Sequence, residues 1–308
     1  MIAELKQTKD YLKDKGIQSP AAEAEHIFCH FLNCEKIDLY TSDISFNEFQ
    51  RQDIYELIER RASGEPLQYI LEKTEFYGFE FKIRKGVFIP RPETEILVNA
   101  VLSHLTEHRT PNTEHRNILD LCTGTGNIAI SLTKTLPHYK MFISDIAPGA
   151  VSLAKENAVL NNVSNAIEFR CGDLFSPWHN KRTFFDIIAC NPPYVRKEEL
   201  ENLPLNVRNE PQEALDGGID GLDFYRRIIK EAPLYMKDKG YLFFELNPET
   251  ADDVKDILVK DFTDIEIIKD YTNKERVVYA QLKERLMLGE RLISQSPVNQ
   301  LPINQHNG

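Results

Sequence analysis

The sequence predicts an α/β protein, with an open, mostly parallel sheet wound on both faces by helices and a small helical domain in front of it. Residues 1–72 carry apolar residues at helical spacing. From residue 117, short apolar runs alternate with helical stretches, and a glycine-rich loop follows the first run. A chain of 308 residues has room for both parts.

Residues 1–72 are expected to form four or five short helices. Ser19-Pro20 is typical of an N-cap with proline in the first helical position. The apolar residues that follow are spaced as one helical face: Ala24, Ile27, Phe28, Phe31 and Leu32. Gly64-Glu65-Pro66 is expected to end the last long helix.

Residues 73–285 are expected to form the second domain, which begins with a β-linker over residues 73–92. Alternation in residues 76–83 predicts one strand, and residues 93–105 predict a helix. The strands of the sheet are expected at residues 118–121, 141–144, 167–169, 184–190 and 241–245, with a terminal antiparallel hairpin at 264–268 and 277–282. Residues 286–308, rich in Asn, Gln and Pro, are predicted to be a disordered tail.

Composition excludes several classes of function. The net charge of −11 argues against extended non-specific binding of nucleic acid, because no basic surplus neutralises phosphates. The five cysteines lack CxxC pairing and metal-ligand spacing, which favours thiols in a reducing cytosol and predicts no metal site. No secretory signal follows Met1, and no apolar stretch approaches the about 20 residues of a membrane span. We expect a cytoplasmic protein that binds no membrane.

The glycine-rich loop predicts a nucleotide-type cofactor. It runs from Asp120 to Gly126, after the first strand of the sheet and before a helix. Glycines let the backbone approach a ligand closely, and a helix N-terminus offers free N–H groups. The loop residues expected at the cofactor are Cys122, Thr123, Gly124, Thr125 and Gly126.

Two acidic residues follow the next two strands. Asp145 comes 25 residues after Asp120, where a carboxylate can accept both hydroxyls of a ribose, although a helix N-cap beside Pro148 is the alternative. Asp173 can accept an adenine amine, with Leu174 covering the ring, although a turn aspartate is the alternative. Together with the strand order, these residues favour an adenosine-containing cofactor.

The tetrapeptide Asn191-Pro192-Pro193-Tyr194 follows the apolar run at 184–190. Two prolines fix φ and remove backbone donors, and the first holds Asn191 extended. The turn therefore presents the Asn191 side-chain oxygen and free carbonyls, which can hold the two N–H bonds of an amide or an exocyclic amine. Tyr194 can pack on the flat face of that group. The tetrapeptide predicts chemistry on a planar –NH2 group.

The chain resembles the HemK/PrmC family, the N5-glutamine methyltransferases of peptide chain release factors. The resemblance runs from about residue 60 to residue 282, with a weaker helical match before it. Its segments are GEPLQYIL (64–71), EFYGFEF (75–81), FIPRPETE (88–95), DLCTGTGNIAI (120–130), FFDIIACNPPY (184–194) and NEPQEALDGGIDGLDFYRRII (209–229). The chain departs from the family pattern at Cys122, where glycine is usual, and at residues 245–249, where E-x-G is usual.

The resemblance implies a class I S-adenosylmethionine methyltransferase fold with seven strands, and an N-terminal domain that docks the substrate. It implies S-adenosylmethionine as methyl donor, S-adenosylhomocysteine as product, and the glutamine of the GGQ loop of class I release factors as acceptor. Carried over by position, the residues at the cofactor are 122–126, Asp145, Asp173, Leu174 and Asn191, and those at the substrate are Asn191, Pro192, Pro193, Tyr194, Arg91 and Glu93, with Pro92 and Thr94 helping to close the pocket. Among these, Asn191, Pro192 and Tyr194 are expected to be catalytic. A helix start is a compatible role for residues 91–94.

The expected reaction is direct methyl transfer to the glutamine side-chain nitrogen. That nitrogen is a poor nucleophile because its lone pair is delocalised into the carbonyl. Asn191 Oδ1 and the Pro192 carbonyl can accept its two N–H bonds, aim the lone pair and stabilise the developing positive charge. No strong base is needed before transfer, because the alkylated nitrogen loses its proton readily.

Three alternatives remain open from the sequence. The first is an N6-adenine methyltransferase on DNA or RNA, which the acidic charge and the RPETE segment disfavour. The second is transfer to the glutamine of a ribosomal protein, against which RPETE also argues. The third is a binding module that kept the fold and lost catalysis. The chain is expected to act as a monomer and to make no direct contact with nucleic acid.

Overall fold

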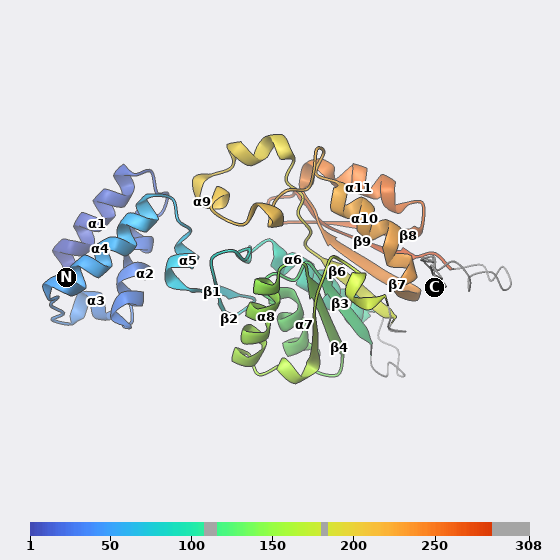
Figure 1. Cartoon of the computed structure of the whole chain (residues 1–308), viewed down its shortest axis with the longest axis horizontal. Helices are drawn as coiled ribbons and strands as arrows, with labels where there is room; N and C mark the ends of the chain where they lie inside the picture. The colour runs from blue at the N-terminus through green and yellow to red at the C-terminus, as the bar shows by residue number, and fades with distance from the viewer. Residues whose placement is uncertain (108–115, 180–183, 285–308) are drawn as a thin grey trace, which may run out of the picture.

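The computed structural model describes residues 1–107, 116–179 and 184–284 (Figure 1). The N-terminal part is helical and the remainder is built around a central sheet, as expected. The disordered tail predicted for residues 286–308 lies outside the described residues.

The helical part holds α1 (Ile2–Asp14), α2 (Pro20–Leu32), α3 (Asp38–Thr41), α4 (Glu48–Ala62) and α5 (Leu67–Leu71). Ser19 is the N-cap of α2 with proline at the first position, although its side chain makes no capping hydrogen bond. A capping box between Asn47 and Gln50 starts α4. Ile27 and Phe28 of α2 pack with apolar residues of α1 and α4 in a separate small core.

Residues 73–82 form a hairpin, so the single strand expected over residues 76–83 was wrong: Phe79–Lys82 form a strand, but Phe76 ends the strand before it. Strand β1 (Lys73–Phe76) pairs antiparallel with β2 (Phe79–Lys82). Tyr77 and Gly78 both have positive φ, 54° and 74°, which is the backbone of a two-residue hairpin turn with the twist of the strands. The apolar alternation continues on both sides of this turn, so the pattern by itself did not show the chain reversal.

The main sheet has the strand order β5-β4-β3-β6-β7-β9-β8. The strands are β3 (Asn117–Leu121), β4 (Lys140–Asp145), β5 (Ile167–Cys171), β6 (Phe185–Cys190), β7 (Met236–Glu245), β8 (Phe262–Lys269) and β9 (Glu275–Leu282). All neighbours pair in parallel except β7 with β9 and β8 with β9. The predicted fold class is therefore confirmed. The order reverses between β3 and β6, where open α/β sheets form a crevice at the carboxyl ends of their strands.

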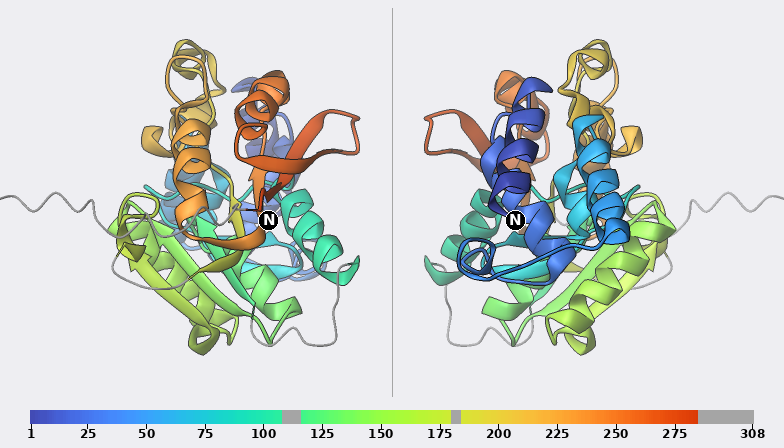
Figure 2. Two further views of the ribbon diagram at one scale, coloured as in Figure 1. Left: turned by 90° about the vertical axis from the view of Figure 1, so that its right-hand side faces the viewer. Right: turned by 90° about the vertical axis from the view of Figure 1, so that its left-hand side faces the viewer.

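Helices cover both faces of the sheet (Figure 2). One face packs against α6 (Thr94–Glu107), α7 (Asn127–Thr135) and α8 (Pro148–Leu160). The other packs against α10 (Asp223–Glu231) and α11 (Ala251–Leu258), with buried Trp178 edge-on to Phe142 and Phe185. Short 3₁₀ turns join several elements, at Ser164–Ala166, Ser176–Trp178, Lys197–Asn202, Gln212–Ala214, Ala232–Leu234 and Pro248–Thr250.

The segment that contains α9 (Leu205–Arg208) reaches from the sheet domain to the helical domain, beside α4 and α5 (Figure 1). Asn209 Nδ2 donates a hydrogen bond of 2.9 Å to the Gly64 carbonyl. Gly64 has a φ of 94°, and a Cβ atom there would lie 2.4 Å from the Leu205 side chain, so glycine is favoured at this junction. Among the described residues, no helix combines the length and the apolarity needed to cross a bilayer.

Candidate active site

A cavity of about 890 Å³ lies at the carboxyl ends of β3, β4 and β6, the place that the strand order marks. The predicted site residues that line it are Cys122, Thr123, Gly124, Thr125, Asp145, Asp173, Leu174, Asn191, Pro192, Pro193, Tyr194 and Arg91. Gly126 and Glu93 do not line it. One cavity thus brings together the residues that sequence patterns placed at a cofactor and at a planar amide.

The glycine-rich loop turns through three left-handed residues: Cys122 (φ 57°), Gly124 (φ 54°) and Gly126 (φ 82°). A residue with a side chain costs about 1–2 kcal/mol in this conformation, which explains why glycine is usual at the position of Cys122. A Cβ atom on Gly124 would meet nothing within 4 Å, so the loop is open toward the cavity there. Gly126 instead packs against α8, where a Cβ atom would lie 3.1 Å from Ala154 Cβ.

Asp120, at the start of the glycine-rich loop, holds the loop through hydrogen bonds in the protein interior. The residue is fully buried, and its Oδ2 accepts hydrogen bonds from Thr123 Oγ1 (2.6 Å) and from the Ala129 amide in the first turn of α7 (3.2 Å). Burial raises the pKa of Asp120 to about 7, and these two donors oppose the rise. The carboxylate therefore orders the loop from the protein side instead of facing a ligand.

Asp145 holds the same loop from the side of β4. Its Oδ2 accepts a hydrogen bond from the Gly124 amide (2.9 Å), and its Oδ1 accepts one from the Ala147 amide (2.9 Å). The N-cap of α8 is Ala147, so Asp145 is not the helix cap that the sequence offered as an alternative. A carboxylate has about four acceptor sites, so Asp145 keeps free lone pairs at the cavity.

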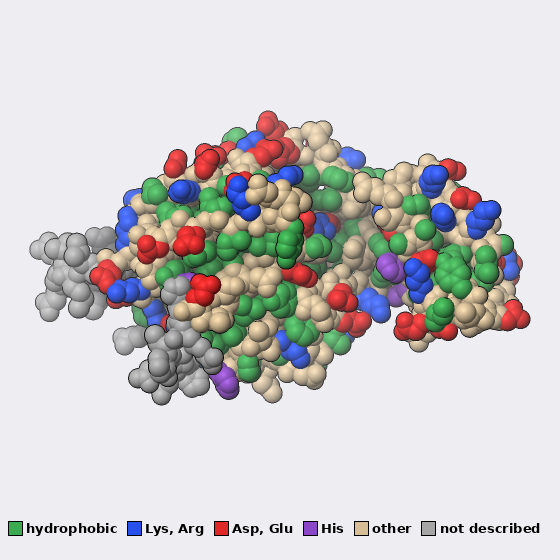
Figure 3. Space-filling model, turned by 180° about the vertical axis from the view of Figure 1, so that it is seen from behind, with side chains coloured by type: hydrophobic (Ala, Val, Ile, Leu, Met, Phe, Trp, Pro, Cys, Tyr) green, Lys and Arg blue, Asp and Glu red, His purple; other side chains and the backbone are tan. Residues whose placement is uncertain are grey.

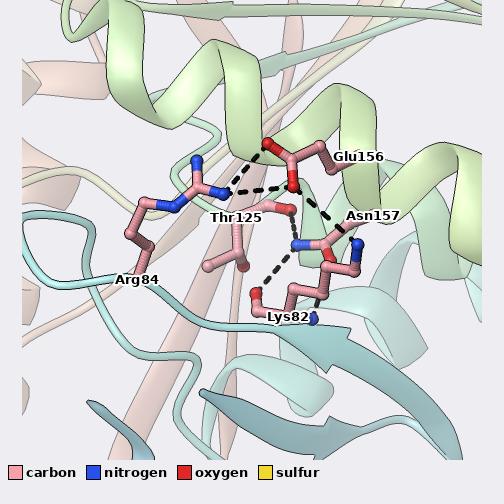
Figure 4. Close-up of polar contacts among 5 residues, drawn as sticks. All are labelled: Lys82, Arg84, Thr125, Glu156 and Asn157. Atoms are coloured by element: carbon pink, nitrogen blue, oxygen red, sulfur yellow. Dashed lines mark hydrogen bonds and ion pairs between the residues drawn. The ribbon is translucent and has the colours of Figure 1, made fainter.

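A third clamp, which the sequence did not reveal, is Asn157 of α8 (Figure 4). Its Nδ2 donates to the carbonyls of Thr125 (2.9 Å) and Lys82 (3.1 Å), and its Oδ1 accepts from the Lys82 amide (2.7 Å). Next to it, Arg84 Nη2 lies 3.1 Å from both carboxylate oxygens of Glu156. The β1–β2 hairpin is thereby fastened to the back of the glycine-rich loop.

Asp173 and Leu174, which follow β5, also line the cavity. Asp173 Oδ2 pairs with Arg227 Nη2 of α10 at 2.5 Å, across 54 residues of sequence. Leu174 is buried in a left-handed conformation (φ 45°), and its carbonyl accepts from Ser144 Oγ at 3.1 Å. Ile146 also lines the cavity and is 65% exposed, although sequence reasoning had not named it. Its position directly after Asp145 is the feature of the sequence that could have predicted its place in the cavity.

The Asn-Pro-Pro-Tyr turn follows β6 and is held by the segment at 215–221. The Val195 amide donates to the Leu215 carbonyl (2.9 Å), and the Gly217 amide donates to the Val195 carbonyl (2.8 Å). A Cβ atom on Gly217 would lie 2.7 Å from Tyr194 Cα, and one on Gly221 would lie 2.6 Å from the Tyr194 carbonyl oxygen. Gly217 and Gly221 of the DGGIDG stretch are thus explained by close packing against this turn, whereas a Cβ atom on Gly218 would meet the Asp223 side chain.

The Asn191 amide is oriented by two side chains from other elements. Asn191 Nδ2 donates to Thr94 Oγ1 of α6 (3.2 Å), and Thr94 Oγ1 donates to Glu245 Oε2 at the end of β7 (2.6 Å). Among the described residues, none donates a hydrogen bond to Asn191 Oδ1 or to the Pro192 carbonyl. Two acceptors of the turn are therefore left for a ligand.

Glu245 is the buried end of this chain of contacts. Its side chain and backbone are 1% exposed, and burial raises the pKa of its carboxyl to about 7. The Tyr194 hydroxyl lies 3.4 Å from Glu245 Oε1, a long contact, and the Tyr225 hydroxyl donates to the Glu245 carbonyl (2.8 Å). Sequence reasoning had noted Glu245 only as part of a departure from a family pattern.

Arg91 lines the cavity and links the segment at 88–95 to the segment at 209–215. It makes an ion pair with buried Glu210, which also accepts a hydrogen bond from the Ile89 amide (3.0 Å). The guanidinium lies 4.7 Å from the centre of the Phe88 ring. Glu93 is exposed just before α6. Arg91 therefore ties the FIPRPETE and NEPQEAL segments together, whereas a substrate contact by Glu93 stays a prediction.

Two family models match the chain. The PrmC N-terminal domain matches residues 4–71, and the methyltransferase small domain matches residues 79–218. The first covers the helical part and the second covers most of the cavity lining.

Curated relatives match over nearly the whole chain, and three of them carry the name release factor glutamine methyltransferase. The protein of Thermodesulfovibrio yellowstonii is 44% identical over 266 residues, which are 86% of this chain and 93% of the relative. That of Fusobacterium nucleatum is 38% identical over 94% of this chain and 81% of the relative. That of Bacillus cereus is 34% identical over 91% of this chain and 98% of the relative.

Solved structures support the fold. The catalytic domain of hMettl16, in complex with an RNA hairpin, has a TM-score of 0.54 at 18% identity and covers 73% of this chain and 81% of its own. The 16S rRNA N2 G1207 methyltransferase of Thermus thermophilus, in complex with AdoMet and guanosine, has a TM-score of 0.50 at 17% identity and covers 68% and 50%. At these identities the likeness concerns the fold alone.

Proposed function

The chain belongs to the family of release factor glutamine methyltransferases, and we propose that it transfers a methyl group from S-adenosylmethionine to a glutamine side-chain nitrogen in the GGQ loop of class I release factors. The observation that carries this proposal is the pair of free acceptors, Asn191 Oδ1 and the Pro192 carbonyl, beside the glycine-rich loop in one cavity. They match the two N–H bonds of a primary amide.

The cavity fits the cofactor. The open space over Gly124 and the left-handed turn of residues 122–126 leave room for close approach by a ligand. Asp145 offers free lone pairs for ribose hydroxyls, Asp173 stands where an adenine amine is expected, and Leu174 and Ile146 supply apolar cover. When bound there, S-adenosylmethionine supplies a methyl group on a positively charged sulfur.

The turn at 191–194 acts on the acceptor. Asn191 Oδ1 and the Pro192 carbonyl accept the two N–H bonds, which aims the nitrogen lone pair at the methyl group and stabilises the charge that develops on nitrogen. Tyr194, half-buried in the cavity wall, packs against the flat amide. The nitrogen–carbon bond forms as the carbon–sulfur bond breaks, its electrons stay on sulfur, and the alkylated nitrogen gives its proton to water.

The helical domain, residues 1–72, is the proposed docking surface for the release factor, since α9 joins it to the cavity wall. Direct recognition of nucleic acid is not part of the proposal. The chain carries a net charge of −11, and Lys and Arg side chains are scattered among acidic ones on the face seen in Figure 3. We further propose that the protein acts as a monomer in the cytoplasm, where all five cysteines stay free thiols.

The test is methyl transfer from labelled S-adenosylmethionine to a purified class I release factor, mapped by mass spectrometry. We expect one methyl group on the GGQ glutamine and none on a release factor that carries GGA instead. Transfer to other sites, or none with the cofactor still bound, would contradict the proposal. A ribosomal protein and an adenine-containing oligonucleotide, assayed in parallel, would then reveal which acceptor is used.

A further inference from the structure

A line of three polar side chains runs from the protein interior to the cavity. Glu245 ends β7, Thr94 starts α6 and Asn191 follows β6. Thr94 lies 151 residues from Glu245 and 97 from Asn191 in sequence. Thr94 is 1% exposed, so water does not replace either of its contacts.

The order of donors along this line fixes the Asn191 amide. A threonine hydroxyl has one hydrogen, and Thr94 gives it to Glu245 Oε2 at 2.6 Å. The oxygen of Thr94 can then only accept, so it must face the Nδ2 side of Asn191, at 3.2 Å. With Nδ2 turned inward, Oδ1 is left on the cavity side of the amide.

We propose that Thr94 and Glu245 are positioning residues, which hold Asn191 with Oδ1 toward the acceptor nitrogen. The inference rests on the proposed function, because it assigns to Asn191 Oδ1 the task of accepting an N–H bond. A flipped amide would present two N–H donors to the N–H bonds of the substrate, and the contact would become repulsive. Neither residue touches the reacting atoms.

The surroundings of Glu245 set the pKa of its carboxyl, and so decide whether this carboxyl is ionised and accepts the Thr94 hydrogen. The groups that face its carboxyl are Thr94 of α6, Tyr194 of the turn after β6, Arg276 of β9, which attracts the negative charge, and Glu93, which repels it. Arg276 is itself 3.0 Å from Asp270, so its charge is shared. Burial is the largest influence and raises the pKa of Glu245 to about 7.

Protonation of Glu245 reverses the line. An ionised carboxylate only accepts, so Thr94 donates to it and Asn191 Oδ1 faces the cavity. A neutral carboxyl can donate to Thr94, whose own hydrogen is then free for Asn191 Oδ1, and the amide turns over. Glu245 is ionised above its raised pKa, so the arrangement with Asn191 Oδ1 toward the cavity is present above about pH 7. It is lost as the pH falls through about 7.

The first experiment compares Thr94→Val with Thr94→Ser in single-turnover methyl transfer to the release factor. Valine keeps the shape and removes the hydroxyl, whereas serine keeps it. We expect Thr94→Val to lower the rate constant by about tenfold or more, with KM for the release factor and Kd for the cofactor within about threefold of wild type. Thr94→Ser should restore most of the rate.

The matched control is Thr106→Val on the same helix. Thr106 is exposed, and its hydroxyl bonds only to the Leu102 carbonyl, at 2.8 Å, among the described residues. This control should keep the wild-type rate. Thermal unfolding and cofactor titration of each variant show whether it is folded and able to bind.

The second experiment measures the single-turnover rate from pH 6 to pH 9 for wild type and Glu245→Gln. Wild type should rise with pH through about 7, and Glu245→Gln should lose that rise because glutamine does not titrate there. Equal rates for Thr94→Val and Thr94→Ser, or an unchanged rise in Glu245→Gln, would overturn the inference. Failure of wild type to methylate the release factor would instead overturn the proposed function, so the two failures are distinct.

Discussion

The two halves of the cavity are held together in different ways. On the cofactor side, Asp120, Asp145 and Asn157 all bond to backbone groups of the glycine-rich loop or its flanks. On the acceptor side, Asn191 is oriented by Thr94 and Glu245 through side chains alone. The loop thus depends on backbone shape, whereas the orientation of the Asn191 amide depends on the chemical identity of each partner.

This difference explains which departures the chain tolerates. Cys122 replaces a glycine in the loop and still adopts its left-handed backbone, because the clamps hold the main chain. The acceptor side offers no such latitude, since a hydroxyl and a carboxylate are both needed to orient one amide. We therefore expect substitutions on the acceptor side to affect the rate, and those on the cofactor side to affect binding and stability.

The largest effect is expected from Asn191→Ala. The variant removes a preorganised acceptor from the transition state and should lower kcat by about a hundredfold to a thousandfold, the loss typical of a single such group. Cofactor affinity should change by less than about threefold. Steady-state methylation and calorimetric cofactor titration measure the two. A wild-type kcat would show that Asn191 does not hold the amide.

An intermediate effect is expected from Asn157→Ala. The variant leaves the buried Thr125 carbonyl and the partly buried Lys82 amide and carbonyl without their Asn157 partner, so the free energy of unfolding should fall by about 2–3 kcal/mol. The loosened loop should weaken cofactor binding, whereas kcat at saturating cofactor should change less. Urea unfolding and cofactor titration check this, with exposed Asn202→Ala as control. A lower kcat with unchanged stability and cofactor affinity would contradict the idea that Asn157 acts through the shape of the loop.

The smallest effect is expected from Cys122→Gly. Glycine relieves the left-handed strain but adds freedom to the unfolded chain, so the free energy of unfolding should change by less than about 1 kcal/mol. Cys122→Val should be destabilised clearly more, because a β-branched side chain suits positive φ poorly. Thermal unfolding of both variants decides the matter. Equal losses would mean that the thiol, not the backbone conformation, is the constraint.

One expectation failed because local pattern and chain path diverge. Residues 76–83 alternate as one strand would, but the Tyr77-Gly78 turn folds them into a hairpin. Gly126 belongs to the loop motif, packs against α8 and does not line the cavity, so its contact with a cofactor stays a prediction. In both places the local pattern is present, and the position of a neighbouring element decides what the residues do.

The sequence alone determined the fold class, the family and a set of residues that line the cavity, because strand periodicity, the glycine-rich loop and the Asn-Pro-Pro-Tyr turn are local patterns. Only the tertiary structure decided that Thr94 and Glu245 meet Asn191, that Asn157 clamps the loop, and that Arg91 pairs with Glu210. These contacts join residues up to 151 positions apart. No local period records such pairs, since their partners are chosen by how separate strands and helices pack.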